Sequence, residues 1–387
     1  MPSRWTRGSQ LGALALCLIL CVAGGARAQS AADPEPVPQA PRASQAPQAP
    51  QEPAPPNADH GASFPLDVAG YNAVRNLTGD DLADRNVFRE YSGSIFVSKT
   101  IGRWLFHSEI NANTAPEWDS EGIHLLPRMS HLSVKLETAS VNFNWRDWLQ
   151  VQTGFLFVPT YWRTHRYQST TLTVDEPLID QAVFPTAFTG AMIHGDRYFE
   201  EGGISYQLYA GYAQQANFED AVVSADLTRS RAAGGKVVWH VPSHHMFHTF
   251  DVGFHAHRAL NSDTSRTHIY GAELNLEMGR IQVLGEFADA SVGALPGRAG
   301  YYRQGFYLQP SYRIAPQLFL VARYERLNRD SRDPDVNRLA KQSLGVTYRP
   351  LPAVSLKLEA DRFEPQRGRL PPYYGVGFAV VYFFRVP

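Results

Sequence analysis

Histidines gathered in one segment are the side chains of this sequence that could bind a metal ion or titrate near neutral pH. Residues 240–257 read HVPSHHMFHTFDVGFHAH and hold six of the 13 histidines. In an extended strand, His255 and His257 point the same way as Asp251, a spacing that can hold a divalent metal or form a proton-sensitive gate. The histidines at 244–245 belong to an expected turn, so the six do not converge. We therefore expect a polar lining and no bound metal, with His255 and His257 as the candidates if a metal does bind.

Nucleophilic catalysis finds little support in the sequence. Serine and histidine are both present, but no G-x-S-x-G motif occurs. Cys17 and Cys21 lie inside an apolar N-terminal run, so the chain beyond it has no thiol for catalysis, disulfides or cysteine-based metal sites. We predict neither an enzyme nor a cofactor.

The elements that must position the polar side chains are β-strands. From about residue 90 onward, segments such as SVKLETASVNFNW and VSLKLEADRF alternate apolar and polar residues and are rich in β-branched and aromatic side chains. This period of two does not fit a helix. Strands are expected at 90–99, 101–112, 130–144, 147–157, 187–198, 202–214, 230–240, 246–257, 266–277, 280–290, 302–313, 316–326, 340–350, 352–362 and 374–384.

The expected connections alternate short and long without exception. Short ones include NWRDW, EMGR and RIAPQ, whereas the longest covers residues 158–186. Short periplasmic turns on one side and long extracellular loops on the other are typical of transmembrane β-barrels, and Greek-key sandwiches have no reason to sort loops in this way.

The parity of the strands predicts one more. The first and last of the fifteen expected strands both run toward the short-turn side, and an antiparallel sheet cannot close in that arrangement. Closure requires a further strand before residue 90, which we place in 63–76 although its alternation is poor. The predicted fold is all-β: a transmembrane antiparallel barrel of sixteen strands, with fourteen as the fallback. Both termini of the chain are then expected on the periplasmic side.

One face of these strands is apolar and the other is dense in charge. The final strand shows this, since Val376, Phe378 and Val380 alternate with Gly377 and Ala379. Because charged residues are almost never buried unpaired, the polar face must be wet, and a water-filled lumen inside a lipid-facing wall satisfies both faces. The charged lumen residues that we predict are Arg280, Arg303, Arg313, Arg323, Arg349, Lys357, Glu273, Glu286, Glu325 and Glu359. The five arginines form a basic ladder in one interpretation, and chance alternation explains them nearly as well.

The N-terminal part of the chain differs in composition. Residues 1–28 combine Arg4 and Arg7, an apolar run and an Ala-Arg-Ala end, which predicts a cleaved signal peptide; an uncleaved anchor is the alternative. Residues 29–62 are rich in Pro, Ala and Gln and predict a disordered periplasmic tether, either a plain spacer or a docking strip for a partner. Without the signal peptide, 33 basic and 37 acidic residues remain. This balance gives no indication of nucleic-acid binding.

The barrel region 63–387 resembles Gram-negative outer-membrane porins, in particular the phosphate-selective and substrate-specific porins. The resemblance is carried by the N-terminal leader, the alternating strands, the aromatic-rich closing strand and the stretch GFLFVPTYWRTHRY…DEPLIDQAVFPTAFTGAMIHGD at 154–196. It implies location in the outer membrane, contact with its lipid and, as porins of this class are often trimers, a homotrimer.

The resemblance also implies that the third extracellular loop, 158–186, folds into the lumen and sets its narrowest point. Opposed charges there would create a transverse field that favours small polar solutes; the alternative is that they are ordinary solvated loop charges. The basic set is Arg163, His165 and Arg166, and the acidic set is Asp175, Glu176 and Asp180. The sequence predicts a weakly selective channel for passive diffusion of small hydrophilic solutes or ions. The alternative is a barrel that acts as a scaffold for a periplasmic redox or export partner.

Overall fold

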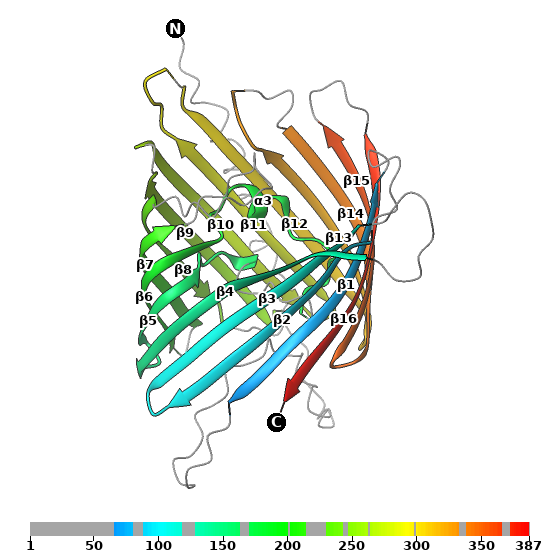
Figure 1. Ribbon diagram of the computed structural model, residues 1–387, viewed down its shortest axis with the longest axis horizontal. Helices are drawn as coiled ribbons and strands as arrows, with labels where there is room; N and C mark the ends of the chain where they lie inside the picture. The colour runs from blue at the N-terminus through cyan, green and yellow to red at the C-terminus, as the bar shows by residue number, and fades with distance from the viewer. Residues whose placement is uncertain are drawn as a thin grey trace, which may run out of the picture. The chain divides into compact units, whose positions relative to one another are not determined.

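Strand pairing closes the chain into a ring. The computed structural model describes residues 66–79, 88–117, 128–162, 170–199, 202–213, 230–242, 247–261, 264–297, 299–332, 338–365 and 372–386. Within these residues, sixteen antiparallel strands form one closed barrel, in which each strand pairs with its neighbours along the chain and β1 pairs with β16 (Figure 1). The predicted sixteen-stranded barrel is confirmed.

The strands are long enough to cross a membrane at a tilt, since about 9–11 residues suffice. In chain order they are β1 (Asp67–Gly79), β2 (Phe88–Ile101), β3 (Trp104–Glu117), β4 (Arg128–Arg146), β5 (Leu149–Phe157), β6 (Ala187–Phe199), β7 (Gly202–Ala213), β8 (Ser230–His240), β9 (Thr249–Leu260), β10 (Arg266–Met278), β11 (Ile281–Val292), β12 (Tyr301–Ala315), β13 (Leu318–Asn328), β14 (Arg338–Leu351), β15 (Val354–Pro365) and β16 (Tyr373–Val386). The short helix α3 (Leu178–Ala182) lies between β5 and β6. Among the described residues, no helix is both long and apolar enough to cross a membrane.

The strand required for closure is β1. It was predicted within 63–76, and it pairs with β16 along its length, with Val74 opposite Val380. Its alternation is poor because its inner face is apolar as well: Tyr71 and Ala73 are both buried. They pack against residues inside the barrel. The first residues of β1 and the last of β16 lie at the short-turn end, as the parity of the strands predicted.

Tight turns lie at one end of the barrel and most longer connections lie at the other. Gly102 and Gly279 occupy two of the tight turns with φ of 59° and 56°, a left-handed conformation that glycine adopts without a steric cost. The predicted strict alternation is wrong at one place. The connection at 241–248 is longer than the one at 261–265 on the opposite end, because β9 continues to Leu260.

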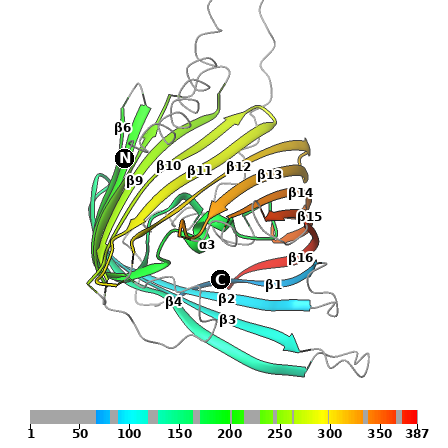
Figure 2. The same ribbon diagram turned by 90° about the horizontal axis from the view of Figure 1, so that it is seen from above.

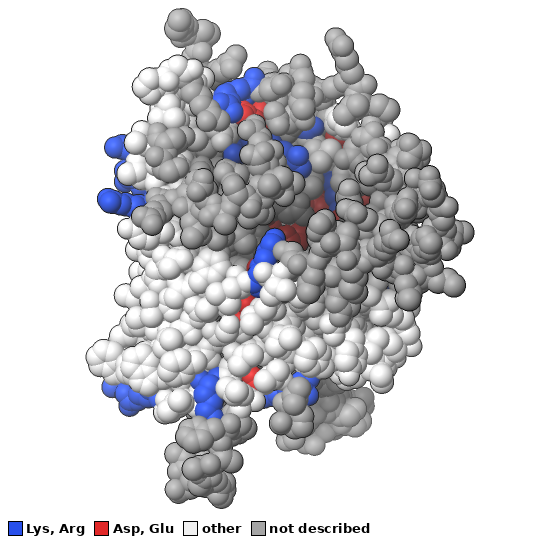
Figure 3. Space-filling view, in the orientation of Figure 1, with Lys and Arg blue, Asp and Glu red and all other residues white. Residues whose placement is uncertain are grey.

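The two faces of the wall alternate as predicted. On the outer face, Leu344, Leu358 and Phe378 are exposed, whereas Ser343 and Glu359 on the inner face are buried. In Figure 3, the lower part of the wall is mostly white, with a few charged atoms near the middle of the view, and Lys and Arg atoms lie along the lower rim. An apolar outer surface with its charges at the ends and inside is the pattern that lipid contact requires.

Aromatic side chains ring the outer surface near the strand ends. The exposed ones at the short-turn end include Trp104, Trp145, Trp148, Tyr198, Phe199, Trp239, Tyr312, Tyr348 and Tyr382, and those toward the opposite end include Tyr212, Tyr270, Tyr302 and Tyr374. Aromatic girdles at both ends of an apolar band are typical of transmembrane barrels.

Candidate pore constriction

A segment of the connection between β5 and β6 lies inside the barrel. Viewed from above, α3 sits within the ring of strands (Figure 2). We call residues 170–186 the inner segment. Its Val174, Ile179 and Asp180 are at most 1% exposed, which excludes an arrangement as a free extracellular loop. The resemblance implied this inward course, whereas its role as the narrowest point stays a prediction.

Carboxylates of the wall bind backbone N–H groups of the inner segment. The N–H of Val174 donates to Glu359 Oε2 at 2.8 Å, and the N–H of Leu178 donates to Glu325 Oε2 at 2.6 Å. Both glutamates point inward from β15 and β13 and are buried. Charge-assisted hydrogen bonds of this kind are stronger than neutral ones, so they hold the segment at a defined height on the wall.

Cations of β13, β14 and β15 bind carbonyl groups of the inner segment. The Arg323 guanidinium donates to the Asp175 carbonyl at 2.9 Å, and the Lys357 ammonium donates to the Thr173 carbonyl at 3.1 Å. Arg349 reaches the Thr170 carbonyl at 2.7 Å. Three cations of the wall therefore donate hydrogen bonds to the backbone of the inner segment. These bonds leave the three side chains with fewer N–H donors for a passing anion.

Apolar contacts fix the remainder of the inner segment. Ile179 and Val183 pack with Ile269 and Leu327 of the wall in one buried cluster. On the other side of the barrel, Val174 packs in a cluster with residues of β1 and β16, among them Ala379. The small inner residues of the closing strand thus make room for the segment.

Wall charges beneath the segment pair with one another. Arg323 Nε lies 2.8 Å from Glu325 Oε1, and Lys341 Nζ lies 3.3 Å from Asp361 Oδ2 and 3.4 Å from Asp175 Oδ2. Buried charges persist only when they are paired in this way. Lys341 and Asp361 have the inward parity that the alternation of their strands predicts, although they were not among the predicted site residues.

The charges predicted within the third loop have different surroundings. Asp175 joins the wall network through Lys341, and Asp180 is buried, where it accepts a hydrogen bond from Thr160 Oγ1 at 3.0 Å. Glu176 is half-buried. The predicted basic partners Arg163, His165 and Arg166 lie outside the described residues. The transverse field therefore stays a prediction.

The five predicted lumen arginines do not form a ladder. Arg280 is exposed in the β10–β11 turn and does not line the wall, which corrects its predicted position. Arg303 and Arg313 lie ten residues apart in β12, and at a rise of about 3.3 Å per residue they stand roughly 33 Å apart. Arg323 and Arg349 contact the inner segment instead.

The other predicted lumen residues all have inward parity and are buried. Lys357 and the glutamates Glu325 and Glu359 lie under the inner segment. Glu273 and Glu286 lie on β10 and β11 and are 6% and 3% exposed. None of the five is a freely solvated pore charge.

The two candidate histidines have separate partners. His257 Nδ1 lies 2.7 Å from the Tyr209 hydroxyl, while His255 lies against Phe184 and close to Glu273 and Glu286. His255 and His257, the candidates if a metal binds, therefore do not converge on one site, because each ring turns to a different neighbour.

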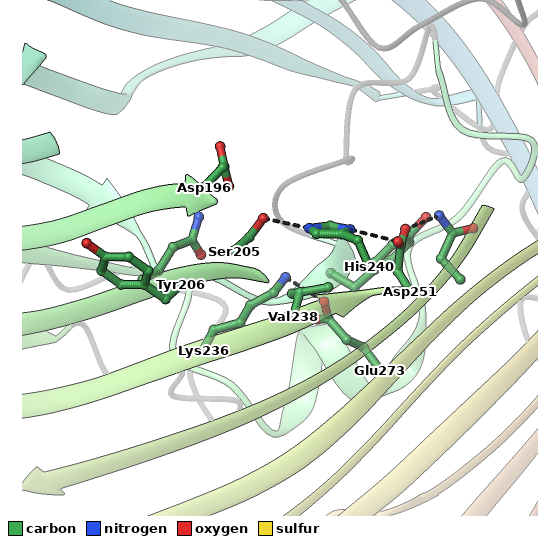
Figure 4. A pocket seen from close by; sticks show the side chains of 11 residues that line it. Asp196, Ser205, Tyr206, Lys236, Val238, His240, Asp251 and Glu273 are labelled. Atoms are coloured by element: carbon green, nitrogen blue, oxygen red, sulfur yellow. Dashed lines mark hydrogen bonds and ion pairs between the residues drawn. The ribbon is translucent and has the colours of Figure 1, made fainter. Parts of the chain in front are cut away.

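A Ser-His-Asp chain that sequence reasoning missed borders a cavity near the short-turn end (Figure 4). Ser205 Oγ lies 2.6 Å from His240 Nε2, and His240 Nδ1 lies 2.7 Å from Asp251 Oδ1. This order of groups activates serine nucleophiles in hydrolases. The cavity has a volume of about 240 Å³ and is also lined by Asp196 and Lys236.

Two features oppose a catalytic role for this chain of groups. Asp196 stands directly opposite Ser205 in the β6–β7 register, so its carboxylate would repel a developing oxyanion. Ser205 also lies within a strand that is paired on both sides, where the ladder engages the backbone N–H groups that an oxyanion hole would need. The arrangement fits a hydrogen-bonded polar lining.

Comparison with known proteins identifies the fold. No protein-family model matches the chain, and no curated protein matches it. The trimer form of OmpT, an outer membrane protein of Vibrio cholerae, is similar with a TM-score of 0.52 and 9% identity over 84% of this chain and 100% of that chain.

Two structures from other bacteria have the same fold. The outer membrane channel DcaP of Acinetobacter baumannii has a TM-score of 0.52 and 11% identity, covering 82% of this chain and 97% of that one. OpdQ of Pseudomonas aeruginosa has a TM-score of 0.50 and 12% identity, covering 83% of this chain and 99% of that one. The protein therefore has the barrel fold of outer-membrane channels. Sequence identities this low show the fold alone and no closer relationship.

Proposed function

We propose that this protein is an outer-membrane channel of a Gram-negative bacterium, through which small hydrophilic solutes or ions diffuse passively. The observation that carries the proposal is the inner segment, which lies within the barrel and is held by buried hydrogen bonds such as Val174 N–H to Glu359. A barrel that served only as an anchor would have no need for a segment fixed across its interior.

Weak charge selectivity is part of the proposal. Near the inner segment, Arg323 and Lys341 are paired with Glu325, Glu359 and Asp361, so opposite charges largely cancel along this wall. A balanced lining gives little electrostatic preference for one sign of ion.

Planar-bilayer recording of the purified full chain tests both statements. We expect stepwise conductance and, under a tenfold salt gradient, a reversal potential well below the ideal limit of about 59 mV for either sign of ion. A potential close to that limit would overturn weak selectivity. Absence of any conductance from correctly folded protein would overturn the channel.

The parts of the chain outside the described residues enter the proposal through their sequence. Residues 1–28 would direct export and be removed, and residues 29–62 would extend from the barrel on the periplasmic side as a tether. The protein would contact outer-membrane lipid, and a homotrimer is the expected assembly. Mass spectrometry of the mature N-terminus and mass photometry in detergent test these points.

The competing proposal is a scaffold that binds a periplasmic redox or export partner. Its support is the Pro-rich tether at 29–62. A folded barrel that does not conduct and that co-purifies with a haem protein in stoichiometric amount would favour this function over diffusion.

A further inference from the structure

Three adjacent strands bring three metal-ligating side chains together on the inner wall. His255 comes from β9, Glu273 from β10 and Glu286 from β11. One donor atom of each lies within 4.8 Å of the donors of the other two. The residues are 9%, 6% and 3% exposed, so the group lies away from bulk water.

Glycines on neighbouring strands leave the space in which these side chains lie. Gly271 is directly opposite His255, and a Cβ at Gly271 would stand 1.6 Å from His255 Nε2. Gly253 is opposite Glu273, and a Cβ there would stand 2.4 Å from its Cγ. The imidazole and the carboxylate therefore occupy positions that any larger residue would block.

The donor atoms of this group that point toward one another have no hydrogen-bond partner among the described residues. Among the described residues, none forms a hydrogen bond with either ring nitrogen of His255, with Glu273 Oε2 or with Glu286 Oε2. The second oxygen of each carboxylate is held, by Lys236 Nζ at 2.8 Å for Glu273 and by the Tyr161 N–H at 3.4 Å for Glu286. Buried polar atoms are normally paired, so four such atoms in one place require an explanation.

The charges of the two glutamates favour a bound cation between them. Glu273 stands directly opposite Glu286 in the β10–β11 register, and like charges at directly opposed positions destabilise a sheet. Among the described residues, Lys236 is the one cation that forms an ion pair with either carboxylate, and it pairs with Glu273 and not with Glu286. One positive charge against two buried carboxylates leaves an excess negative charge.

We propose that His255, Glu273 and Glu286 bind a divalent transition metal ion of the zinc class. One imidazole nitrogen and two carboxylate oxygens are a donor set that suits Zn²⁺ and also Co²⁺, Mn²⁺ or Fe²⁺. Lys236 and the Tyr161 N–H act as outer partners that orient the carboxylates, as metal sites commonly require.

Metal binding at this site would affect the β5–β6 connection that lies inside the barrel. Phe184 of the inner segment meets the His255 ring edge-on, with 4.8 Å between ring centroids, and Tyr161 belongs to the same β5–β6 connection. A bound ion would therefore stabilise the wall on which this connection rests. Metal removal is expected to increase current fluctuations through the channel.

Cobalt titration of the full chain in detergent, without a histidine tag and after dialysis against a chelator, tests the site. We expect one Co²⁺ per chain with visible absorption bands of a nitrogen- and oxygen-ligated ion, and displacement by Zn²⁺. If the wild-type protein binds no metal at this stoichiometry, the proposal fails, and a proton shared by Glu273 and Glu286 becomes the explanation for their proximity.

Substitutions then locate the ion. His255→Asn and Glu286→Gln are expected to weaken Co²⁺ binding by at least about a hundredfold, and Lys236→Met by about ten- to a hundredfold. Gly271→Ala keeps every donor but displaces the imidazole, so it should also abolish the absorption. The matched control is His257→Asn, which removes a histidine of the same strand and should leave binding unchanged.

Two outcomes would contradict this location. Equal loss of binding in His257→Asn would place the ion elsewhere, and so would unchanged binding in His255→Asn. Because a variant can fail to fold, X-ray absorption at the zinc edge of the wild-type protein provides an independent reading. It should report nitrogen and oxygen ligands and no sulfur.

Discussion

The backbone N–H of Val174 donates a 2.8 Å hydrogen bond to Glu359, although 185 residues separate the two in the chain. The same carboxylate lies 3.7 Å from Arg323 and 3.6 Å from Lys341. Glu359 therefore links the inner segment to the charges of the wall. Its removal affects both at once.

Substitution of Glu359 by Ala is expected to release the inner segment. It leaves a buried N–H without its acceptor and removes one negative charge from two buried cations, which typically costs about 3–5 kcal/mol. We expect a lower unfolding temperature and a larger, noisier single-channel conductance. Glu364→Gln, in the same strand but paired with half-exposed Arg362, is the control and should behave as wild type.

A large residue at Ala379 should displace the inner segment from the closing strand. Ala379 is fully buried and packs in a cluster with Val174, so Ala379→Phe overfills this contact at a cost of about 1–3 kcal/mol. Val380→Phe places the same ring on the outer face, where Val380 is exposed, and should have little effect. Indistinguishable conductance in the two variants would argue against the contact.

Substitutions of the two residues of one ion pair are expected to shift the ion preference of the channel in opposite directions. Lys341 Nζ lies 3.4 Å from Asp175 Oδ2. Lys341→Met leaves Asp175 uncompensated and should move the reversal potential toward cations, whereas Asp175→Asn should move it toward anions. Shifts of the same sign would show that this pair does not face the permeation path.

The Ser205–His240–Asp251 chain is expected to be structural. Ser205→Ala should leave conductance and any background hydrolysis of a nitrophenyl ester unchanged, because Asp196 opposite Ser205 disfavours an oxyanion. Hydrolysis by the wild-type protein that Ser205→Ala abolishes would reveal an enzyme in the lumen and overturn this interpretation.

Local pattern was sufficient to predict most of the barrel. Alternation in segments such as β15 distinguishes lipid-facing Leu358 from buried Glu359, and antiparallel parity required β1 although its own residues hardly signal a strand. The first inference uses only contacts between strands that are neighbours along the chain. The second adds one requirement, that the sheet close between its first and last strands.

The wall beneath the inner segment could not be predicted in the same way. The Val174–Glu359 bond joins strand and loop residues at a separation that no periodicity encodes, and inward parity alone made Glu359 look solvated. The Glu273–Glu286 pair is different. The tight turn at 279–280 sets the β10–β11 register, so their opposition could have been derived from the sequence.

The contact between Val174 and the closing strand has a consequence for assembly in the membrane. Val174 docks on residues from both ends of the barrel region, Tyr71 and Ala73 from β1 together with Ala379 and Val381 from β16. That docking surface does not exist until the first and last strands have met. The contacts of Val174 with this surface can therefore form only after the barrel has closed. In the proposed channel, docking of Val174 therefore reports that the seam between β1 and β16 is complete.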